Sequence, residues 1–583
     1  MSEQSLYQNN EHKSLKRLRT FQVGVLLLGA VVLWRLFSLQ VLSHGYYEAR
    51  AEGKHQVERS LLPQRGSIFL KLGDESFPVV TNKDYFLVYA EPSKIHSPAR
   101  VVDTVTPILG LETQEWHELL GRLNDRNDPY EPIKRKVPAD QVAQLEKADL
   151  DGVGWLPETY RFYPERNIGG HVFGFIGFQG DEKVGQYGLE GHFDKELKGE
   201  SGFLKSTRDA LGALIAVGER SVRQALNGDD FYLTIEQPIQ LAACARLKEF
   251  SDYFQAEGGS VTVLDPKTGA VLAMCGQPDF EPAQYNEVEN ITAFNNPSIF
   301  HAYEPGSVFK PVTMAAALDV GDVEPTTTYI DEGEVEIGPF TIRNADFKAH
   351  GEQTMTQVLE KSLNTGTIFL VDKMGKGTFK RYVKRFGFGE ATGIQLDQEV
   401  AGDISSLDKR GDIFSLTGSY GQGLTVTPLQ LASAFGAIAN GGTLMKPYIV
   451  DRVVSDGGRT SATEPDPVKQ VISSKTSRIL SGMLVSVVEN GFGEKAGVPG
   501  YYLAGKTGTA QVAGEGGRYG EKTIHTFAGY GPVGDPKFVM VVRLDNPKDI
   551  NFASDSVAPL FKQIAEVILN YFEVEPDYLV TNQ

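Results

Sequence analysis

Cysteine is almost absent from this sequence. Cys244 and Cys275 are the only two among 583 residues, and neither belongs to a CxxC pair or to a cysteine–histidine cluster with the spacing of a zinc site. The H-E-x-x-H zinc motif and the G-x-S-x-G nucleophile motif are missing as well. We therefore expect no metal, no cofactor and no disulfide scaffold. We interpret both cysteines as small buried apolar side chains and leave open whether they are paired.

An excess of positive charge is also missing. The chain has 57 Lys and Arg against 75 Asp and Glu, which gives a formal net charge of −18. Such a chain repels polyphosphates, so nucleic acid is not an expected partner. The composition, 41% hydrophobic and 23% charged, is ordinary for a folded protein. At this length we expect two or more domains.

Long apolar runs are rare, and the chain has one, at residues 21–42. As a helix of about 22 residues rising ~1.5 Å each, it would cross a bilayer core. Four cations precede it: Lys13, Lys16, Arg17 and Arg19. The positive-inside rule then places residues 1–20 in the cytoplasm. A cleaved signal peptide is the alternative, but the run is too long and no small-x-small cleavage site follows.

We therefore predict a single-pass anchor in the cytoplasmic (inner) membrane. The chain after residue 42 then lies outside the cytoplasm, in the periplasm if the cell is Gram-negative. Arg35 lies inside the apolar run, where a charge is costly. It either extends to the outer interface or contacts a partner helix.

The rest of the chain changes character near residue 226. Residues 43–225 hold short mixed segments separated by Gly and Pro, which predicts an α+β N-terminal domain, here called the pedestal. Residues 226–575 begin with strands, continue with helices and end with strands and an amphipathic helix. This order predicts an α+β catalytic domain. Residues 576–583 form a short C-terminal tail.

The first chemical pattern is EPGSVFK, which contains Ser307 and Lys310. Pro305–Gly306 break the preceding segment, and an apolar-periodic helix starts at or near Ser307. Residues three apart on a helix share a face, and a buried lysine with a lowered pKa can take the proton of a serine nucleophile. The backbone N–H of Ser307, at the helix start, can bind a developing oxyanion.

The same S-x-x-K pattern recurs at Ser406 and Lys409. It lies in the charged stretch SSLDKRGD, with no apolar helix behind it. We therefore favour Ser307 as the nucleophile and Lys310 as its base.

The second pattern is KSLNTG, which contains Ser362 and Asn364. A hydroxyl can relay a proton between a lysine and a leaving amine, and an amide can bind a peptide carbonyl. Taken alone this pattern is weak, because a helix cap or a turn would also explain it.

The third pattern is Lys506-Thr507-Gly508-Thr509 on a predicted strand. Such a strand can pair with an extended peptide while Lys506, Thr507 and Thr509 hold a terminal carboxylate. Gly508 leaves space for a substrate, and the backbone N–H of Thr509 is a candidate second oxyanion donor. A second K-T-G starts at Lys267, but it fits the turn of a hairpin.

One glycine pattern points elsewhere. Residues 529–534 satisfy G-x-G-x-x-G after a predicted strand. A dinucleotide site would need a helix after the glycines, whereas DPKFVMVV predicts another strand. We therefore expect no nucleotide site.

Taken in order, the three patterns resemble the S-x-x-K, S-x-N and K-T-G set of penicillin-binding proteins and serine β-lactamases. PQRGSIF around Arg65, RFYPE around Arg161 and GQYGLEG around Glu190 are similar to pedestal motifs of class B penicillin-binding proteins. On these motifs the chain is identified as a member of that class, the monofunctional peptidoglycan D,D-transpeptidases. Its short pedestal resembles the division-specific septal type more than the elongation type.

The resemblance implies a fold and a site. The fold is an anchor helix, a dimerisation-like pedestal in which Arg65 and Glu190 pack together, and a transpeptidase domain. That domain has an antiparallel sheet with helices on both faces and a helical subdomain. The implied catalytic residues are Ser307, Lys310, Ser362, Asn364 and Lys506, and the implied substrate-binding residues are Thr507, Gly508 and Thr509.

The resemblance also implies a reaction and partners. Ser307 attacks the penultimate D-alanine carbonyl of a stem peptide, and an amine of a neighbouring stem peptide then takes the acyl group. β-Lactams would trap the same serine. The expected protein partners are a polytopic membrane glycan polymerase and other division proteins. The alternatives are an elongation-type enzyme, a β-lactamase, a membrane-bound β-lactam sensor and a non-catalytic scaffold.

Overall fold

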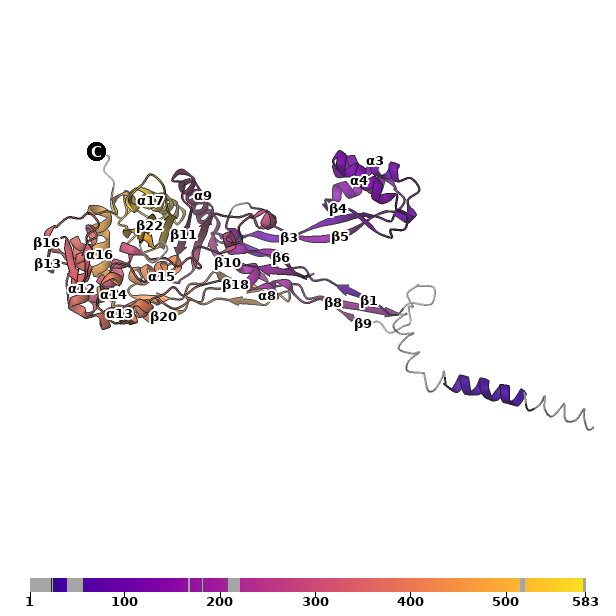
Figure 1. The fold of residues 1–583 in the computed structure, drawn as a ribbon, viewed down its shortest axis with the longest axis horizontal. Helices are drawn as coiled ribbons and strands as arrows, with labels where there is room; N and C mark the ends of the chain where they lie inside the picture. The colour runs from indigo at the N-terminus through magenta and orange to yellow at the C-terminus, as the bar shows by residue number, and fades with distance from the viewer. Residues whose placement is uncertain are drawn as a thin grey trace, which may run out of the picture. The chain divides into compact units, whose positions relative to one another are not determined.

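The computed structural model describes residues 23, 25–38, 56–165, 168–180, 182–207, 221–513 and 519–579 (Figure 1). The chain divides into two compact units, Met1–Pro63 with Glu200–Leu226, and Gln64–Gly199 with Asn227–Gln583. The first unit holds a three-stranded antiparallel sheet in the order β1-β8-β9. Its strands are β1 (Gln56–Leu61), β8 (Gly202–Thr207) and β9 (Ser221–Arg223).

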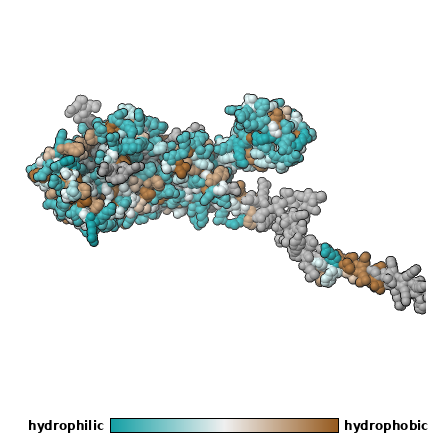
Figure 2. Space-filling view, in the orientation of Figure 1, coloured by the Kyte–Doolittle hydropathy of each residue, from teal (hydrophilic) through white to brown (hydrophobic). Residues whose placement is uncertain are grey.

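The predicted anchor is described only in part. Residues 25–37 are helical, and the apolar side chains of this helix are exposed, as the brown surface in Figure 2 shows. Among the described residues, none of the helices has the length and the apolar content that a membrane span needs. Residues 21, 22, 24 and 39–42, as well as residues 1–20, lie outside the described residues.

A seven-stranded sheet forms the base of the second unit. Its order is β19-β18-β10-β2-β3-β4, and β5 also pairs with β3. The strands are β2 (Ile68–Leu72), β3 (Glu75–Ala90), β4 (Glu131–Val137), β5 (Val153–Phe162), β10 (Asp230–Glu236), β18 (Val450–Val454) and β19 (Thr460–Ala462). Strand β10 is parallel to β2 and antiparallel to β18. Strands from both halves of the sequence therefore share one sheet.

Three helices pack on the far end of β3 and β5. They are α3 (Pro98–Leu109), α4 (Thr113–Leu123) and α5 (Ala139–Ala148). Their apolar faces enclose a small core that includes Val88, Val105 and Leu119. The helical periodicity of TQEWHELLGRL and ADQVAQLEKA predicts α4 and α5, and the structure confirms both.

A buried carboxylate ties the pedestal motifs together. Glu190, in the short helix α7 (Gly188–His192), is fully buried and accepts a hydrogen bond of 2.6 Å from Nε of both Arg65 and Arg161. Arg65 also pairs with Asp194 at 2.8 Å, at the start of α8 (Asp194–Lys198). The expected contact between Arg65 and Glu190 is therefore confirmed.

The main sheet of the second unit has five antiparallel strands in the order β12-β11-β23-β22-β21. They are β11 (Gly258–Leu264), β12 (Val271–Gln277), β21 (Ala504–Ala513), β22 (Tyr519–Gly531) and β23 (Phe538–Asp545). Alternate residues of a strand point to opposite faces. In β23, Val539 and Val541 join one apolar core, and Met540 and Val542 join the other.

Helices cover both faces of this sheet. Helices α9 (Gln237–Tyr253) and α17 (Ala553–Tyr571) pack on one face, and α15 (Pro428–Ala439) packs on the other (Figure 1). The antiparallel sheet with helices on both faces is confirmed. The hairpin β11–β12 and the strand that follows the Gly529–Gly534 pattern are confirmed as well.

The second unit holds further helices and several two-stranded ladders. The helices are α6 (Gly170–Phe173), α10 (Lys310–Val320), α11 (Met355–Glu360), α12 (Asn364–Met374), α13 (Lys376–Arg385), α14 (Ile413–Gly418) and α16 (Ser474–Asn490). Two-stranded ladders join β6 (Phe175–Gln179) to β7 (Glu182–Gln186), β13 (Thr328–Asp331) to β16 (Gly351–Thr354), β14 (Glu334–Ile337) to β15 (Phe340–Arg343), and β17 (Thr443–Met445) to β20 (Pro467–Gln470).

The two cysteines form a disulfide. Cys244 in α9 is bonded to Cys275 in β12, with their Cα atoms 5.3 Å apart. The sequence left their pairing open, and the structure shows that they are bonded; both are buried, as expected. The hairpin carries β12 back under α9, so two cysteines 31 residues apart become neighbours. The predicted location outside the cytoplasm, where disulfides persist, was the available signal for this pairing.

Candidate active site

Ser307 lies in a short turn between the preceding loop and helix α10. The turn is a 3₁₀-helix, η5 (Gly306–Phe309), and the α-helix begins only at Lys310. Gly306 has a φ of +60° and donates its N–H to the carbonyl of Gly421 at 3.1 Å. Val308 and Phe309 are fully buried while Ser307 is half-buried. The turn is thus fixed by its neighbours and leaves the serine accessible.

Lys310 is the central cation of the site. It is 0% exposed, and its Nζ donates to the carbonyl oxygen of Ser362 and, at 3.2 Å, to the Ser362 hydroxyl. Burial lowers the pKa of Lys310 well below its ordinary value, and the neighbouring cation Lys506 lowers it further. Among the hydrogen bonds of the described residues, this lysine binds Ser362 and not Ser307. A neutral lysine in this place can accept a proton.

Ser362 and Asn364 lie between α11 and α12. Ser362 has a φ of +56°, a left-handed conformation that costs a residue with a side chain about 1–3 kcal/mol. Asn364 is the first residue of α12, and its Nδ2 donates to the carbonyl of Arg343 at 2.8 Å. The S-x-N segment is therefore held in an unusual conformation against Lys310.

Lys506 belongs to β21, which is the edge strand of the five-stranded sheet. It is 0% exposed, and burial lowers its pKa to about 7. Its Nζ donates to the carbonyl of Thr507 at 3.1 Å. No ion pair of the described residues includes Lys310 or Lys506. Two buried lysines thus lie close enough for Lys506 to lower the pKa of Lys310, and no carboxylate of the described residues pairs with either.

Gly508 allows β21 to pack against η5, the turn that carries Ser307. A Cβ at this position would lie 2.9 Å from Cγ1 of Val308 and 3.0 Å from the carbonyl oxygen of Pro305, which is closer than side-chain contacts allow. The space beside Gly508 is therefore filled by η5, where the sequence predicted room for a substrate. Thr509 is half-buried, and its Oγ1 accepts from the backbone N–H of Ala553 at 3.0 Å.

The two competing motifs lie apart from these contacts. Ser406 is in the 3₁₀-helix η6 (Ser405–Asp408) and is buried, without a hydrogen-bond partner for its Oγ in the described part of the chain. Lys267 is in the turn between β11 and β12 and pairs with Asp535. Neither contacts Ser362 or Lys506 through a hydrogen bond of the described residues.

A cavity of about 680 Å³ is lined by the residues just before η5 and by part of the sheet, and neither Ser307, Lys310 nor Lys506 belongs to its wall. Residues 300–304, Gln511 and Val512 of β21, and Arg543 of β23 contribute to its wall. Arg543 is buried and pairs with Asp545 at 2.7 Å. Because β21 carries both the third motif and part of this wall, an extended chain along the edge strand would reach the cavity.

Two families match the chain. Residues 259–566 match the penicillin binding protein transpeptidase domain, and residues 60–233 match the penicillin-binding protein dimerisation domain. The first match alone spans more than half of the sequence. The chain belongs to the penicillin-binding protein transpeptidases. The two domains together confirm the class B assignment made from the motifs.

The chain is similar to members of this family over nearly its whole length. It is 32% identical to stage V sporulation protein D of Bacillus subtilis over 518 residues. The aligned region covers 88% of this chain and 79% of the relative. It is 29% identical over 565 residues to peptidoglycan D,D-transpeptidase FtsI of Escherichia coli, covering 96% and 92%. A crystal structure of penicillin binding protein 3 from Mycobacterium tuberculosis, complexed with aztreonam, superposes with a TM-score of 0.68 and 27% identity, covering 89% and 98%.

Proposed function

We propose that this penicillin-binding protein is a serine-type peptidoglycan D,D-transpeptidase that cross-links stem peptides through an acyl-enzyme on Ser307. The observation that carries the proposal is the buried group around Lys310. Its Nζ lies 3.2 Å from the Ser362 hydroxyl, and both burial and Lys506 lower its pKa. A lysine that loses its proton readily, three residues from an accessible serine, is suited to nucleophilic catalysis.

In the first half of the reaction, Lys310 takes the proton of Ser307. The serine Oγ forms a bond to the carbonyl carbon of the penultimate D-alanine, and the backbone N–H groups of Ser307 and Thr509 bind the oxyanion. The C–N bond to the terminal D-alanine then breaks. Ser362, which already accepts from Lys310, passes that proton to the leaving amine.

In the second half, an amine of a neighbouring stem peptide attacks the acyl carbonyl. Its proton returns through Ser362 to Lys310, the bond between the acyl carbon and Ser307 Oγ breaks, and Lys310 gives its proton to that oxygen, which regenerates the serine. A β-lactam acylates Ser307 in the same way. Its leaving amine stays tethered to the acyl group, so the adduct is long-lived.

The edge strand β21 holds the donor peptide. We propose that the peptide adds to β21 as an extra strand and that Lys506, Thr507 and Thr509 hold its terminal carboxylate. Gly508 brings this strand against the nucleophile turn. The side chain of Asn364, half-buried at the start of α12, binds a peptide carbonyl of the substrate.

The cellular setting is part of the same proposal. Residues 21–42 anchor the chain in the cytoplasmic membrane, residues 43–225 form the pedestal, and residues 226–575 form the transpeptidase domain outside the cytoplasm. The enzyme then works with a polytopic glycan polymerase and other division proteins at the septum. Depletion of the protein should give filamentous cells, whereas round cells would indicate an elongation role.

Labelling with a fluorescent penicillin tests the nucleophile. Ser307→Ala should abolish labelling because it removes the hydroxyl that the penicillin would acylate. The matched control is Ser406→Ala, the serine of the second S-x-x-K pattern, which should label at the wild-type rate. Retained labelling in Ser307→Ala would overturn the assignment, and rapid release of hydrolysed penicillin by the wild type would favour a β-lactamase.

A further inference from the structure

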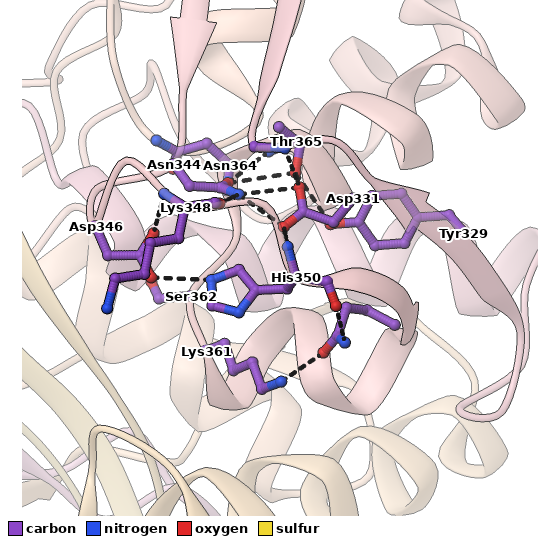
Figure 3. Close-up of polar contacts among 12 residues, drawn as sticks. Tyr329, Asp331, Asn344, Asp346, Lys348, His350, Lys361, Ser362, Asn364 and Thr365 are labelled. Atoms are coloured by element: carbon purple, nitrogen blue, oxygen red, sulfur yellow. Dashed lines mark hydrogen bonds and ion pairs between the residues drawn. The ribbon is translucent and has the colours of Figure 1, made fainter.

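A buried carboxylate lies behind the loop that carries Ser362 and Asn364 (Figure 3). Asp331, the last residue of β13, is 1% exposed. Its neighbours Asn344 and Thr365 are buried as well. None of the three is a residue of the S-x-x-K, S-x-N or K-T-G sets, although Thr365 directly follows Asn364, and the proposed mechanism does not use them.

Every hydrogen-bond donor that faces Asp331 is neutral. Its Oδ1 accepts from Thr365 Oγ1 at 2.7 Å, Asn344 Nδ2 at 3.0 Å and Gly333 N at 3.1 Å. Its Oδ2 accepts from Asn344 Nδ2 at 2.9 Å and His350 N at 3.0 Å. No ion pair of the described residues includes this carboxylate. A buried charge without a counter-ion persists only where several donors are fixed around it.

Asn344 connects Asp331 to the start of helix α12 by hydrogen bonds on both sides of its amide group. Its Oδ1 accepts from the backbone N–H of Asn364 at 3.0 Å and of Thr365 at 3.3 Å. These N–H groups open the helix, where the cap residue Leu363 offers no side-chain acceptor. Asn344 therefore caps α12 from a distant segment of the chain.

Asp331 decides which way the Asn344 amide points. The Nδ2 of Asn344 donates to both carboxylate oxygens, so its Oδ1 is turned toward α12. With the amide reversed, its oxygen would face the carboxylate and its N–H groups would face the N–H groups of the helix. The carboxylate thus fixes the cap together with the carbonyl of Lys348, which accepts from the same Nδ2 at 3.3 Å.

We propose that Asp331 is a positioning residue for acylation. Through Asn344 and Thr365 it holds the first turn of α12. That turn fixes the position of Asn364 and, two residues earlier, of Ser362. The left-handed conformation of Ser362 needs such support, because an unsupported loop would relax from it. This inference rests on the proposed roles of Ser362 and Asn364.

The substitution Asp331→Asn tests the carboxylate directly. An asparagine must turn its NH₂ group toward either the donors on Oδ1 or the donors on Oδ2, so one donor always faces another. We expect the second-order rate constant of acylation by a fluorescent penicillin to fall roughly tenfold to hundredfold. The matched control is Asp346→Asn, the same change at a nearby carboxylate between β15 and β16. The side chain of Asp346 is 37% exposed. It should stay within about twofold of the wild type.

A double-mutant cycle separates positioning from general stability. In an Asn364→Ala background, Asp331→Asn should slow acylation by a smaller factor than in the wild type, because one of the two groups that it positions is gone. Thermal unfolding of each full-length variant is recorded alongside. A loss that acts only through global stability would have the same factor in both backgrounds, and that result would overturn the proposal.

A second variant covers the case in which Asp331→Asn does not fold. Thr365→Ala removes one donor and keeps the carboxylate, so a several-fold loss of acylation rate is expected, again smaller in the Asn364→Ala background. If Ser307→Ala abolishes labelling while Asp331→Asn and Thr365→Ala react at the wild-type rate, the positioning role fails and the proposed transpeptidase stands. Labelling retained in Ser307→Ala would overturn both.

Discussion

Two buried clusters of charge in the second unit are built in opposite ways. In the pedestal, Glu190 is fully buried and bonded to Arg65 and Arg161, each at 2.6 Å. In the site, Lys310 and Lys506 are equally buried, and no carboxylate of the described residues pairs with either. In the first cluster the carboxylate is paired with groups of opposite charge, whereas the second consists of two lysines without a counter-ion among the described residues.

The difference explains why the same kind of burial gives structure in one place and reactivity in the other. A buried ion pair with satisfied hydrogen bonds holds segments together, and removing one partner leaves an unpaired charge. A buried lysine without a counter-ion has a lowered pKa instead, because burial disfavours its charged form. Lys506 falls to about 7, and Lys310 falls well below its ordinary value. The uncompensated cluster is therefore the one suited to proton transfer.

The largest effect is expected for Lys310→Met, which keeps the length of the side chain and removes the amine. The acylation rate by a fluorescent penicillin should fall about 10²–10⁴-fold, the usual contribution of a general base. The unfolding temperature should stay equal or rise, because an apolar side chain replaces a buried cation without a partner. A lower unfolding temperature together with an unchanged acylation rate would contradict this prediction, because it would show that Lys310 stabilises the fold and does not transfer the proton.

Glu190→Gln should show the opposite profile. It leaves two buried arginines facing a neutral amide, so the free energy of unfolding should fall by about 3–5 kcal/mol. The acylation rate of the folded fraction should not change. Chemical unfolding measures the first quantity and penicillin labelling the second. Glu182→Gln is the control, because its side chain is exposed and 3.9 Å from Lys198, and exposed pairs contribute about 0–1 kcal/mol.

The sequence predicts the features that depend on local pattern. The periodicity of 113–123 and 139–148 predicts α4 and α5 with the bounds found, and an apolar helix behind S-x-x-K distinguishes Ser307 from Ser406. Contacts between segments that are far apart in the sequence are harder to predict. The Cys244–Cys275 disulfide, the place of β18 beside β10 and the packing of Gly508 on η5 all depend on which segments the fold brings together.

The Asp331 cluster marks the limit of sequence reasoning most clearly. An aspartate at the end of a strand and an asparagine 13 positions later carry no motif and no periodic signal. Their connection to Asn364 arises only when β13, the loop after β15 and α12 meet. Motifs thus locate the groups that we propose to touch the substrate, whereas the groups that place them require the three-dimensional structure.

The smallest expected effect concerns the coupling between the two lysines. Lys506→Met removes the neighbouring positive charge, so the pKa of Lys310 should rise. In the proposed mechanism acylation requires a neutral Lys310, so the acid limb of the pH profile of acylation should move to higher pH. Lys267→Met, which changes an exposed lysine paired with Asp535, is the control and should leave the limb in place. An unmoved limb in Lys506→Met would show that burial alone sets the pKa of Lys310.

The same substitution should also change how stability depends on pH. The pKa of Lys506 is about 7 in the folded protein and roughly 10.4 in an unfolded chain. Between these values the unfolded state binds more protons, so the free energy of unfolding rises with pH across this window. The destabilisation by Lys506 is complete below pH 7 and is lost toward pH 10.4. Lys506→Met should flatten this slope, whereas Glu190→Gln, which acts in the compensated cluster, should keep it.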